Sequence, residues 1–361
     1  MTAKNRLFLE ETLISIGLMT AAMYVYYVVG GWGLSDHFAD GVFKDYLTGP
    51  GVQLELAISG VGMGLLLALV NRWSESPRVR RWPFGRIVLL KTAAYVGGLL
   101  LVGGVVNGAL ALFVFSPDEM RDVWGTLSFR LMVSVGGWIL LSVFAVNFLL
   151  EVRKKVGPGN LTALFTGRYQ RPRSEHRVFL FVDLKGSTTI AESLGHERYS
   201  RFIQECFHDL SDAVLRYGAR IYQYVGDEAV LTWSADEEGA KVSCMETFFA
   251  FQEKLHAKRD WYQQRFGVSP EFRAGIESGR VTVAEVGDIK REIAYHGDPL
   301  NTAARLLELC KDYDQNVLVS GDFGQAVDAH ATFSTEWQAD VVLRGKREPL
   351  PVYGVRQVPL A

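Results

Sequence analysis

The chain has 361 residues, enough for about two domains, and a formal net charge of −2 at pH 7. This near-neutral charge provides no overall basic field, so we expect no nucleic-acid partner. The three cysteines, Cys206, Cys244 and Cys310, show no metal-ligand spacing, and an odd number cannot form a complete set of disulfides. We therefore expect buried, reduced thiols in a reducing compartment.

Four apolar stretches with few or no charges dominate residues 1–150. Each is long enough for the roughly 20 helical residues that cross a hydrocarbon core of about 30 Å. Buried core helices of a soluble protein are the alternative, but four such segments in series favour an α-helical transmembrane domain. We expect the charged residues near their ends, Glu55, Lys91 and Arg130, to be interfacial. The stretches are 12–34, 52–70, 87–115 and 131–150.

Basic residues concentrate between the second and third stretches and directly after the fourth, whereas the connections 35–50 and 116–129 are acidic on balance. Because cytoplasmic loops carry the excess of Lys and Arg, this distribution predicts that both termini lie in the cytoplasm. We expect an integral protein of the plasma (inner) membrane, with four spans and the lipid bilayer as a partner. The basic residues are Arg72, Arg78, Arg80, Arg81, Arg86, Arg153, Lys154 and Lys155.

Residues 151–177 are predicted to form a cytoplasmic linker. Gly157, Pro158 and Gly159 should end the helix of the fourth span, and Asn160 could cap a short helix over 161–169. Two interpretations stay open. The linker either transmits a rearrangement of the spans to the next domain or connects the two parts passively.

Residues 178–361 alternate strand-like and helix-like patterns, which predicts an α+β domain with a largely antiparallel sheet in the cytoplasm. Short apolar runs bounded by turn residues predict the strands, and apolar residues at helical spacing predict the helices. The expected strands are 178–184, a hairpin over 221–233, 272–287, 291–297, 316–322 and 340–355, and the expected helices are 187–218, about 236–265 and 301–312.

Two aspartates of this domain are candidates for binding a metal ion. Asp183 ends a strand and precedes Gly186, which permits close backbone approach before a helix whose free N–H groups suit phosphate. Asp227 lies at the tip of the hairpin. Taken singly, each could be a helix cap or a turn former. If the two strands are neighbours, both carboxylates meet at one sheet edge beside a phosphate cradle, as Mg²⁺ or a pair of metal ions requires.

Five motifs occur in a fixed order: FVDLKGSTTIAE, YVGDEAV, FRAGIESG, HGDPLNTAARL and LRGKREPLPVYGV. Together they resemble the catalytic domain of class III nucleotidyl cyclases, over about residues 178–356, with its ferredoxin-like α+β fold. The resemblance implies that a homodimer with sites at its interface turns a nucleoside triphosphate into a 3′,5′-cyclic monophosphate and pyrophosphate. Residues 1–150 resemble the multi-span anchors of some family members.

The resemblance assigns the metal site by position. Asp183 and Asp227 correspond to the two metal-binding aspartates of the family, which hold two Mg²⁺ or Mn²⁺ ions, and the Leu184 backbone carbonyl is a possible further ligand. Glu228 corresponds to an acidic neighbour that is not itself a ligand. The residues expected to bind substrate phosphates at the start of the next helix are Gly186, Ser187 and Thr188.

The resemblance also assigns catalytic roles. Asn301 would orient the ribose, and Arg305 would stabilise charge on the phosphates in the transition state. The two are four residues apart and so share one helix face. A helix cap and a surface charge are the alternatives. Either Arg344 or Lys346 would contact the terminal phosphates, and the sequence does not distinguish between them.

The positions that read the base depart from the family. Adenylyl members carry a lysine where this chain has Gln223, and an aspartate or threonine where it has Ala294. Guanylyl members carry glutamate and a small polar residue there. A glutamine amide can donate and accept, so it could pair with either purine edge. We expect ATP as substrate, with guanylyl or dual specificity as the alternative.

Two further classes of function remain open. One is a catalytically silent relative that binds nucleotide and signals as a membrane receptor. The other is a small transporter or receptor that its soluble half regulates. The presence of Asp183, Asp227, Asn301 and Arg305 favours an enzyme, for which activity of the soluble half alone would be the discriminating observation.

Overall fold

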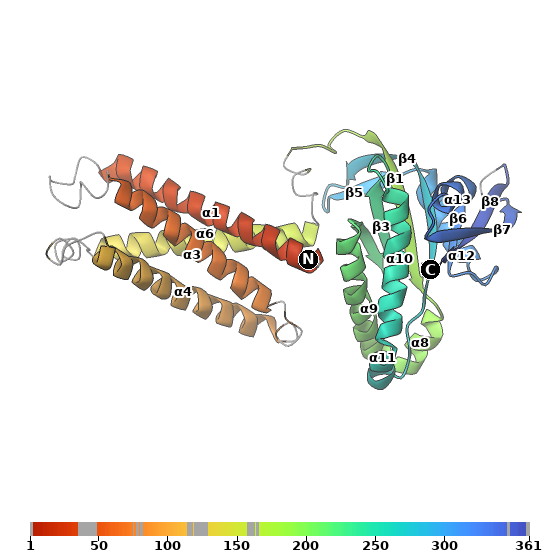
Figure 1. Cartoon of the computed structure of the whole chain (residues 1–361), viewed down its shortest axis with the longest axis horizontal. Helices are drawn as coiled ribbons and strands as arrows, with labels where there is room; N and C mark the ends of the chain where they lie inside the picture. The colour runs from red at the N-terminus through yellow and green to blue at the C-terminus, as the bar shows by residue number, and fades with distance from the viewer. Residues whose placement is uncertain are drawn as a thin grey trace. The chain divides into compact units, whose positions relative to one another are not determined.

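The protein forms two compact units, chiefly Asn5–Lys155 and Val156–Ala361. The structure is a computed structural model, and Figure 1 shows the order of its helices and strands. The residues it describes are 3–34, 49–74, 76, 79, 82–113, 118, 129–156, 163, 166–344 and 347–358.

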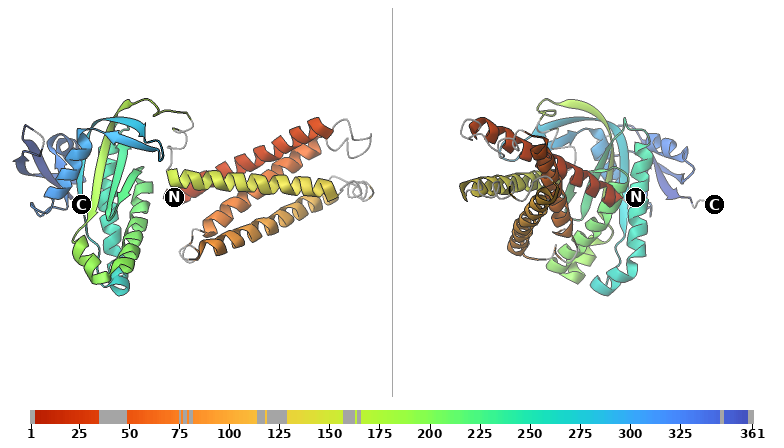
Figure 2. Two further views of the ribbon diagram at one scale, coloured as in Figure 1. Left: turned by 180° about the vertical axis from the view of Figure 1, so that it is seen from behind. Right: turned by 60° about the vertical axis from the view of Figure 1, so that its left-hand side comes forward.

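The first unit contains four long helices that run along one another (Figures 1 and 2). Each contains a segment long and apolar enough to cross a membrane, as predicted. Large apolar side chains such as Leu100 and Phe144 remain exposed on the outside of these helices, as a lipid environment permits. The helices are α1 (Ala3–Leu34), α3 (Pro50–Ser74), α4 (Phe84–Phe113) and α6 (Phe129–Val156).

Glycines allow α1 and α3 to pack closely. A Cβ atom at Gly60 would overlap Thr20, and one at Gly64 would overlap the backbone of Ile16. Small residues at such positions promote helix association where lipid removes the hydrophobic driving force between helices. The two glycines therefore fix where α3 crosses α1.

A polar cluster joins α3, α4 and α6. Lys91 Nζ donates to Asn71 Oδ1 at 2.9 Å, and Tyr95 Oη donates to Asn147 Oδ1 at 2.9 Å. The two asparagines are themselves linked at 3.1 Å. Polar groups of membrane-spanning helices need such partners, because lipid supplies none.

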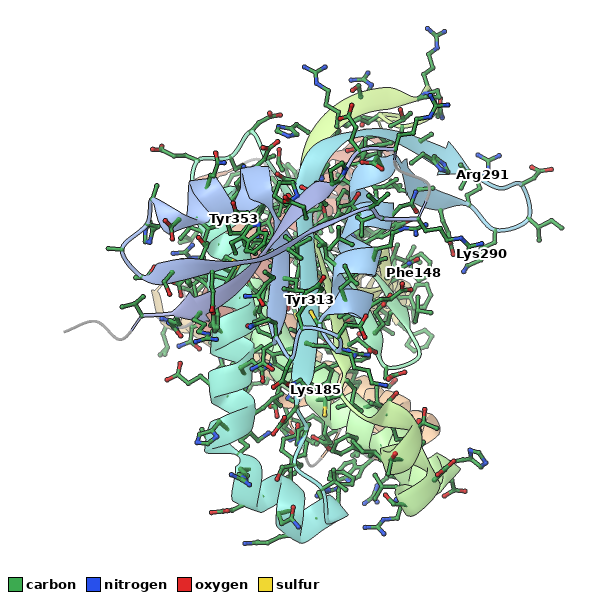
Figure 3. All side chains as sticks on the ribbon, turned by 90° about the vertical axis from the view of Figure 1, so that its right-hand side faces the viewer. Phe148, Lys185, Lys290, Arg291, Tyr313 and Tyr353 are labelled. Carbon is green, nitrogen blue, oxygen red and sulfur yellow. The ribbon has the colours of Figure 1, made fainter. Side chains whose placement is uncertain are left out.

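The second unit is built on an eight-stranded sheet with the strand order β2-β3-β1-β4-β6-β8-β7, and β5 also pairs with β4. All pairings are antiparallel except β4 with β6, so the predicted α+β class is confirmed. The β4–β5 hairpin extends to one side of the sheet, and Lys290 and Arg291 lie in its loop (Figure 3). The strands are β1 (Arg173–Leu184), β2 (Arg220–Val225), β3 (Glu228–Ser234), β4 (Phe272–Val286), β5 (Glu292–His296), β6 (Val317–Ser320), β7 (Phe333–Val341) and β8 (Leu350–Gln357).

Two segments predicted as single helices are each divided. Gly195, at φ 70° and ψ 162°, leaves the helical region between α8 and α9. The second break lies at Lys258, with ψ 10°, between α10 and α11. The predicted helix over 161–169 lies partly outside the described residues, and its last four residues, 166–169, form a turn rather than a helix. The helices are α8 (Ser187–Leu194), α9 (His196–Arg216), α10 (Ala240–Ala257), α11 (Arg259–Phe266), α12 (Asp298–Leu309) and α13 (Gly321–Asp328).

The two faces of the sheet have separate apolar cores. On β1, Val178 and Leu180 pack with α9 and α10, whereas Phe179 and Phe181 pack on the face covered by α12. This alternation follows from the two-residue period of a strand. A Cβ atom at Gly275 of β4 would overlap the backbone of α12, so glycine lets this helix rest directly on the strand.

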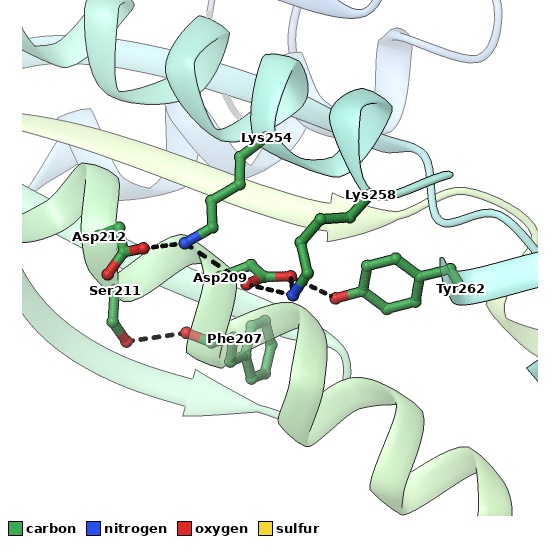
Figure 4. Close-up of polar contacts among 7 residues, drawn as sticks. All are labelled: Phe207, Asp209, Ser211, Asp212, Lys254, Lys258 and Tyr262. Carbon is green, nitrogen blue, oxygen red and sulfur yellow. Dashed lines mark hydrogen bonds and ion pairs between the residues drawn. The ribbon is translucent and has the colours of Figure 1, made fainter. Parts of the chain in front are cut away.

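A charge cluster fastens α9 to α10 and α11 (Figure 4). The Asp209 carboxylate is almost fully buried and accepts hydrogen bonds from Lys258 Nζ at 2.7 and 2.8 Å and from Tyr262 Oη at 2.7 Å. Lys254 bridges Asp209 to Asp212. The break at Lys258 turns the chain so that both the lysine and Tyr262 reach the same carboxylate.

We expect Lys258→Met to destabilise the second unit by about 3 kcal/mol, because it leaves a buried carboxylate without its main cation. In a domain of this size this lowers the melting temperature by roughly 6–12 °C. The measurement is thermal unfolding of the full chain, with Arg259→Met as control, since Arg259 is an exposed neighbour on α11. Equal melting temperatures of the two variants would contradict the role of the cluster.

Candidate active site

Asp183 and Asp227 are held at one end of the β1–β3 pair. Asp183 is the next-to-last residue of β1 and lies opposite Glu228, the first residue of β3. Val225 pairs with Glu228, so Gly226 and Asp227 form a two-residue turn between β2 and β3. Gly226 has φ 63° as the first of the two, which fits a type II′ turn. The hairpin therefore presents Asp227 beside the end of β1.

The electrostatics of this pair favour a bound cation. Burial raises the pKa of the Asp183 carboxyl, and the nearby Asp227 charge raises it further. Arg273 Nη2, on the neighbouring strand β4, donates to Asp183 Oδ2 at 3.2 Å and opposes this rise. Asp227 Oδ2 is buried and has no hydrogen-bond partner among the described residues. An orphaned buried carboxylate oxygen is costly unless a ligand completes it.

The negative charge of the carboxylate pair also raises the pKa of two neighbouring side chains. Burial, followed by the charges of Asp183 and Asp227, raises the pKa of the Glu228 carboxyl. Burial and the Asp227 charge also raise the pKa of Tyr199, on α9, to about 12. The tyrosine thus remains a neutral phenol beside the carboxylates.

The start of α8 lies next to the pair. Gly186 has φ 66° and ψ 27°, a left-handed conformation that favours glycine, and directly precedes the helix. Ser187 is half-buried and Thr188 is exposed at the first turn, whose N–H groups lack intrahelical partners. Lys185, labelled in Figure 3, donates from Nζ to Asn316 Oδ1 at 2.5 Å.

These residues fit a divalent cation. Two carboxylates and the carbonyl of Leu184, the last residue of β1, are oxygen donors of the kind that Mg²⁺ and Mn²⁺ accept. The residues that the structure describes include no group of three or more His, Cys, Asp or Glu side chains arranged for a metal. Mg²⁺ sites commonly use only one or two carboxylates together with water and substrate phosphates, so the orphaned Asp227 oxygen matches this pattern.

Asn301 and Arg305 lie four residues apart on α12. Neither side chain makes a hydrogen bond or ion pair with any described residue. At the start of α12, Pro299 contacts Gly279, which is six residues along β4 from Arg273, about 20 Å at the rise of a strand. Asn301 follows Pro299 by two residues, so it lies near the end of α12 that is remote from the carboxylates, and the helix continues past Gly275 toward them.

The two positions predicted to read the base lie on strands that β3, β1 and β4 separate in the sheet. Gln223 is exposed on β2 and Ala294 is half-buried on β5. Their sequence neighbours Tyr222 and Tyr295 have ring centroids 4.9 Å apart, so side chains of the two strands meet on the α12 face of the sheet.

The two candidates for terminal phosphate contact lie in the connection from β7 to β8. Arg344 is exposed and makes no hydrogen bond or ion pair with a described residue. Lys346 lies outside the described residues.

The sequence interpretation missed Arg273 and Tyr199. Arg273 belongs to the motif FRAGIESG, but its position opposite Asp183 follows only from the register of β1 with β4. Tyr199 lies in a helix with no feature that distinguishes it from a core aromatic residue. The side chains that surround the Asp183 and Asp227 carboxylates were therefore identified from strand pairing and helix packing in the structure rather than from sequence motifs.

Comparisons with known proteins agree with this geometry. A family model described as the adenylate and guanylate cyclase catalytic domain matches residues 170–356. The chain is 38% identical over 207 residues to Adenylate cyclase 2 of Rhizobium meliloti (strain 1021), covering 57% of each chain. It is 34% identical over 148 residues to Adenylate cyclase 1 of that organism, covering 39% of this chain and 22% of the relative. The chain thus spans about half, or less, of the length of these curated relatives.

One solved structure adds support for the fold. A bacterial light-regulated adenylyl cyclase superimposes with a TM-score of 0.53 at 17% identity, covering 63% of this chain and 66% of that one. The expected fold class is confirmed.

We expect Asp183→Asn to raise the melting temperature of the metal-free protein at neutral pH by a few degrees. A carboxyl whose pKa is raised above its ordinary 3.8 stabilises the fold below that pH, and this stability is lost as pH rises through the folded-state pKa. Asparagine removes the charge and keeps an acceptor for Arg273. Mg²⁺ should then stabilise only the wild type.

The control is Asp288→Asn, an exposed carboxylate of the β4–β5 hairpin. A metal-free Asp183→Asn protein that melts below the wild type would show that the ionised carboxylate stabilises the fold and would contradict the expectation.

Proposed function

Because the chain belongs to the adenylate and guanylate cyclase catalytic domain family, we propose that it converts ATP to 3′,5′-cyclic AMP and pyrophosphate for intracellular signalling. The observation that carries the proposal is the juxtaposition of Asp183 and Asp227, with an orphaned oxygen on Asp227, beside the left-handed Gly186 at the start of α8. This arrangement suits a metal-bound triphosphate.

Asp183, Asp227 and the Leu184 carbonyl would hold Mg²⁺ or Mn²⁺, two ions per site. When bound, the ions lower the pKa of the ribose 3′-hydroxyl and neutralise phosphate charge. The backbone of Gly186 and the first turn of α8, with Ser187 and Thr188, would bind phosphate oxygens. No nucleophilic side chain is required, because positioning and electrostatics supply most of the catalysis of phosphoryl transfer.

The reaction forms one bond and breaks another. The 3′-oxygen loses its proton and bonds to the α-phosphorus, and the bond from that phosphorus to the bridging oxygen breaks, so that pyrophosphate leaves. Asn301 would orient the ribose, and Arg305 would stabilise negative charge that develops on the phosphates. Arg344 or Lys346 would contact the terminal phosphates.

A homodimer would complete the site. Asn301 and Arg305 make no hydrogen bond or ion pair with a described residue, and Asn301 lies near the end of α12 that is remote from the carboxylates. A partner subunit can supply them if the α12 faces of two chains meet. Exposed apolar side chains at Val225, Val286 and Ile289 lie on the β2–β3 and β4–β5 hairpins, where such a partner would cover them.

The first unit would anchor this enzyme in a bilayer. Four helices of sufficient length and apolarity support an integral membrane protein, and the basic connections support cytoplasmic termini in a plasma (inner) membrane. We assign the transmembrane domain to 1–150, the linker to 151–177 and the catalytic domain to 178–361.

A guanylyl or dual-specificity cyclase is the second candidate. Gln223 and Ala294 together favour it, because an amide can pair with either purine and alanine adds no hydrogen bond.

We expect the Asp183→Ala protein and the Arg305→Ala protein each to be inactive alone, and a mixture of the two proteins to be active. When subunits exchange at random, half of the dimers are mixed and each mixed dimer has one intact site of two, so about a quarter of wild-type activity should return. Cyclic nucleotide is measured after subunit exchange has been demonstrated by energy transfer between labelled chains.

A mixture of Asp183→Ala with Asp227→Ala is the control. Both changes affect the same half-site, so no mixed dimer has an intact site and activity should stay absent. Failure of the first mixture despite proven exchange would exclude a site shared between chains.

We expect the wild type to discriminate weakly between ATP and GTP, and Gln223→Lys with Ala294→Asp to raise the preference for ATP about tenfold or more. The added lysine and aspartate provide hydrogen bonds that only one base satisfies. Mass spectrometry identifies the products from competing ATP and GTP, and Gln204→Lys, on the exposed face of α9, is the control.

Strict ATP selectivity in the wild type that the double variant loses would show that other residues read the base. Absence of product from either nucleotide would identify a catalytically silent relative.

A further inference from the structure

A cavity lies at the end of β1 opposite to Asp183. It has a volume of about 480 Å³ and is lined by both charged and polar side chains from the segment before β1 and from strands β1 to β4. Nine residues along β1 separate Ser174 of the cavity from Asp183, about 30 Å at the rise of a strand. The lining residues include five arginines, Arg168, Arg173, Arg177, Arg220 and Arg280.

Two of these arginines share one carboxylate. Arg168 Nη2 donates to Glu175 Oε1 at 3.1 Å, and Arg177 Nη1 lies 3.7 Å from Glu175 Oε2. Tyr169 Oη donates to the same carboxylate at 2.9 Å. Arg177 is almost fully buried and forms part of the cavity lining, where Nε also donates to Thr232 at 3.3 Å.

The other three arginines are exposed. Arg173, Arg220 and Arg280 make no hydrogen bond or ion pair with any described residue. They come from β1, β2 and β4, so the sheet itself gathers them. The carboxylates of Asp236 and Glu237 also belong to the lining. Counting all the charged side chains of the lining, five arginines face three carboxylates, an excess of two positive charges.

A concave surface with unpaired guanidinium groups is suited to an anion with several acceptor oxygens. The planar fork of arginine matches phosphate geometry and forms short charge-assisted hydrogen bonds with it. The buried Arg177, held by Glu175 and Thr232, gives the cavity a fixed cationic wall.

We propose that this cavity binds a phosphate monoester or diester group, with Arg173, Arg220 and Arg280 as its ligands. The phosphate can come from a lipid headgroup or from a soluble compound. Binding here does not require cyclase activity.

The test uses the full chain in phosphatidylcholine nanodiscs and metal-free buffer, so that the carboxylate site holds no metal-bound anion. Isothermal titration calorimetry measures binding of inorganic phosphate. We expect Arg173→Gln, Arg220→Gln and Arg280→Gln together to weaken binding about tenfold or more, because each loses charge-assisted hydrogen bonds. Arg198→Gln, Arg201→Gln and Arg259→Gln remove the same charge from α9 and α11 and should leave binding unchanged.

A second variant acts in the opposite direction. Asp236→Asn with Glu237→Gln removes two carboxylates from the lining and should tighten phosphate binding several-fold. This gain cannot arise from misfolding. Equal phosphate affinity of the wild type, the cavity variant and this variant would overturn the proposal.

Nanodiscs that contain phosphatidic acid distinguish the two sources. If a lipid headgroup occupies the cavity, inorganic phosphate binding by the wild type is lost in these nanodiscs. If the ligand is soluble, binding persists with the same affinity. Both results support a phosphate site, whereas phosphate binding that the cavity variant retains would place the anion elsewhere.

Discussion

The antiparallel pairing of β1 with β3 is the constraint on which the catalytic unit depends. This register puts Asp183 opposite Glu228 and so brings the Gly226–Asp227 turn to the end of β1. A shift of one residue would turn Asp183 to the other face of the sheet and would also move Phe179 and Phe181 out of the core that α12 covers. The apolar alternation that stabilises the sheet therefore also fixes the geometry of the carboxylates.

The same sheet separates the two halves of the proposed site. Gly275 allows α12 to rest on β4, and the helix begins with Pro299 beside Gly279, six residues along β4 from the Arg273 that pairs with Asp183. The buried face of α12 packs within the chain, whereas Asn301 and Arg305 make no hydrogen bond or ion pair with a described residue. A second chain with the same fold can satisfy them without any change to the core, which is why dimerisation is the simplest completion of the site.

The sequence was sufficient to predict those features of the fold and site that depend on local motifs and on the periodicity of apolar residues. The position of Asp183 before Gly186, the hairpin around Asp227 and the α+β class all followed from local patterns. Arg273 was not predictable, because only strand pairing places it beside Asp183. The break at Lys258 depends on a contact with Asp209, 49 residues away, which overrides helical periodicity. The arginine cavity was missed for the same reason, since its lining extends from Arg168 to Arg280.

Strand β1 carries charged side chains at both ends. At one end, burial and Asp227 raise the pKa of Asp183, so its ionised form costs stability. At the other end, Arg173, Arg220 and Arg280 line one cavity and make no ion pair with a described residue. A fold selected only for stability would replace such groups with neutral ones, because their ligands supply the missing charge only when bound. The two ends of one strand thus predict two ligands of opposite sign, a divalent cation at Asp183 and a phosphate at the arginines.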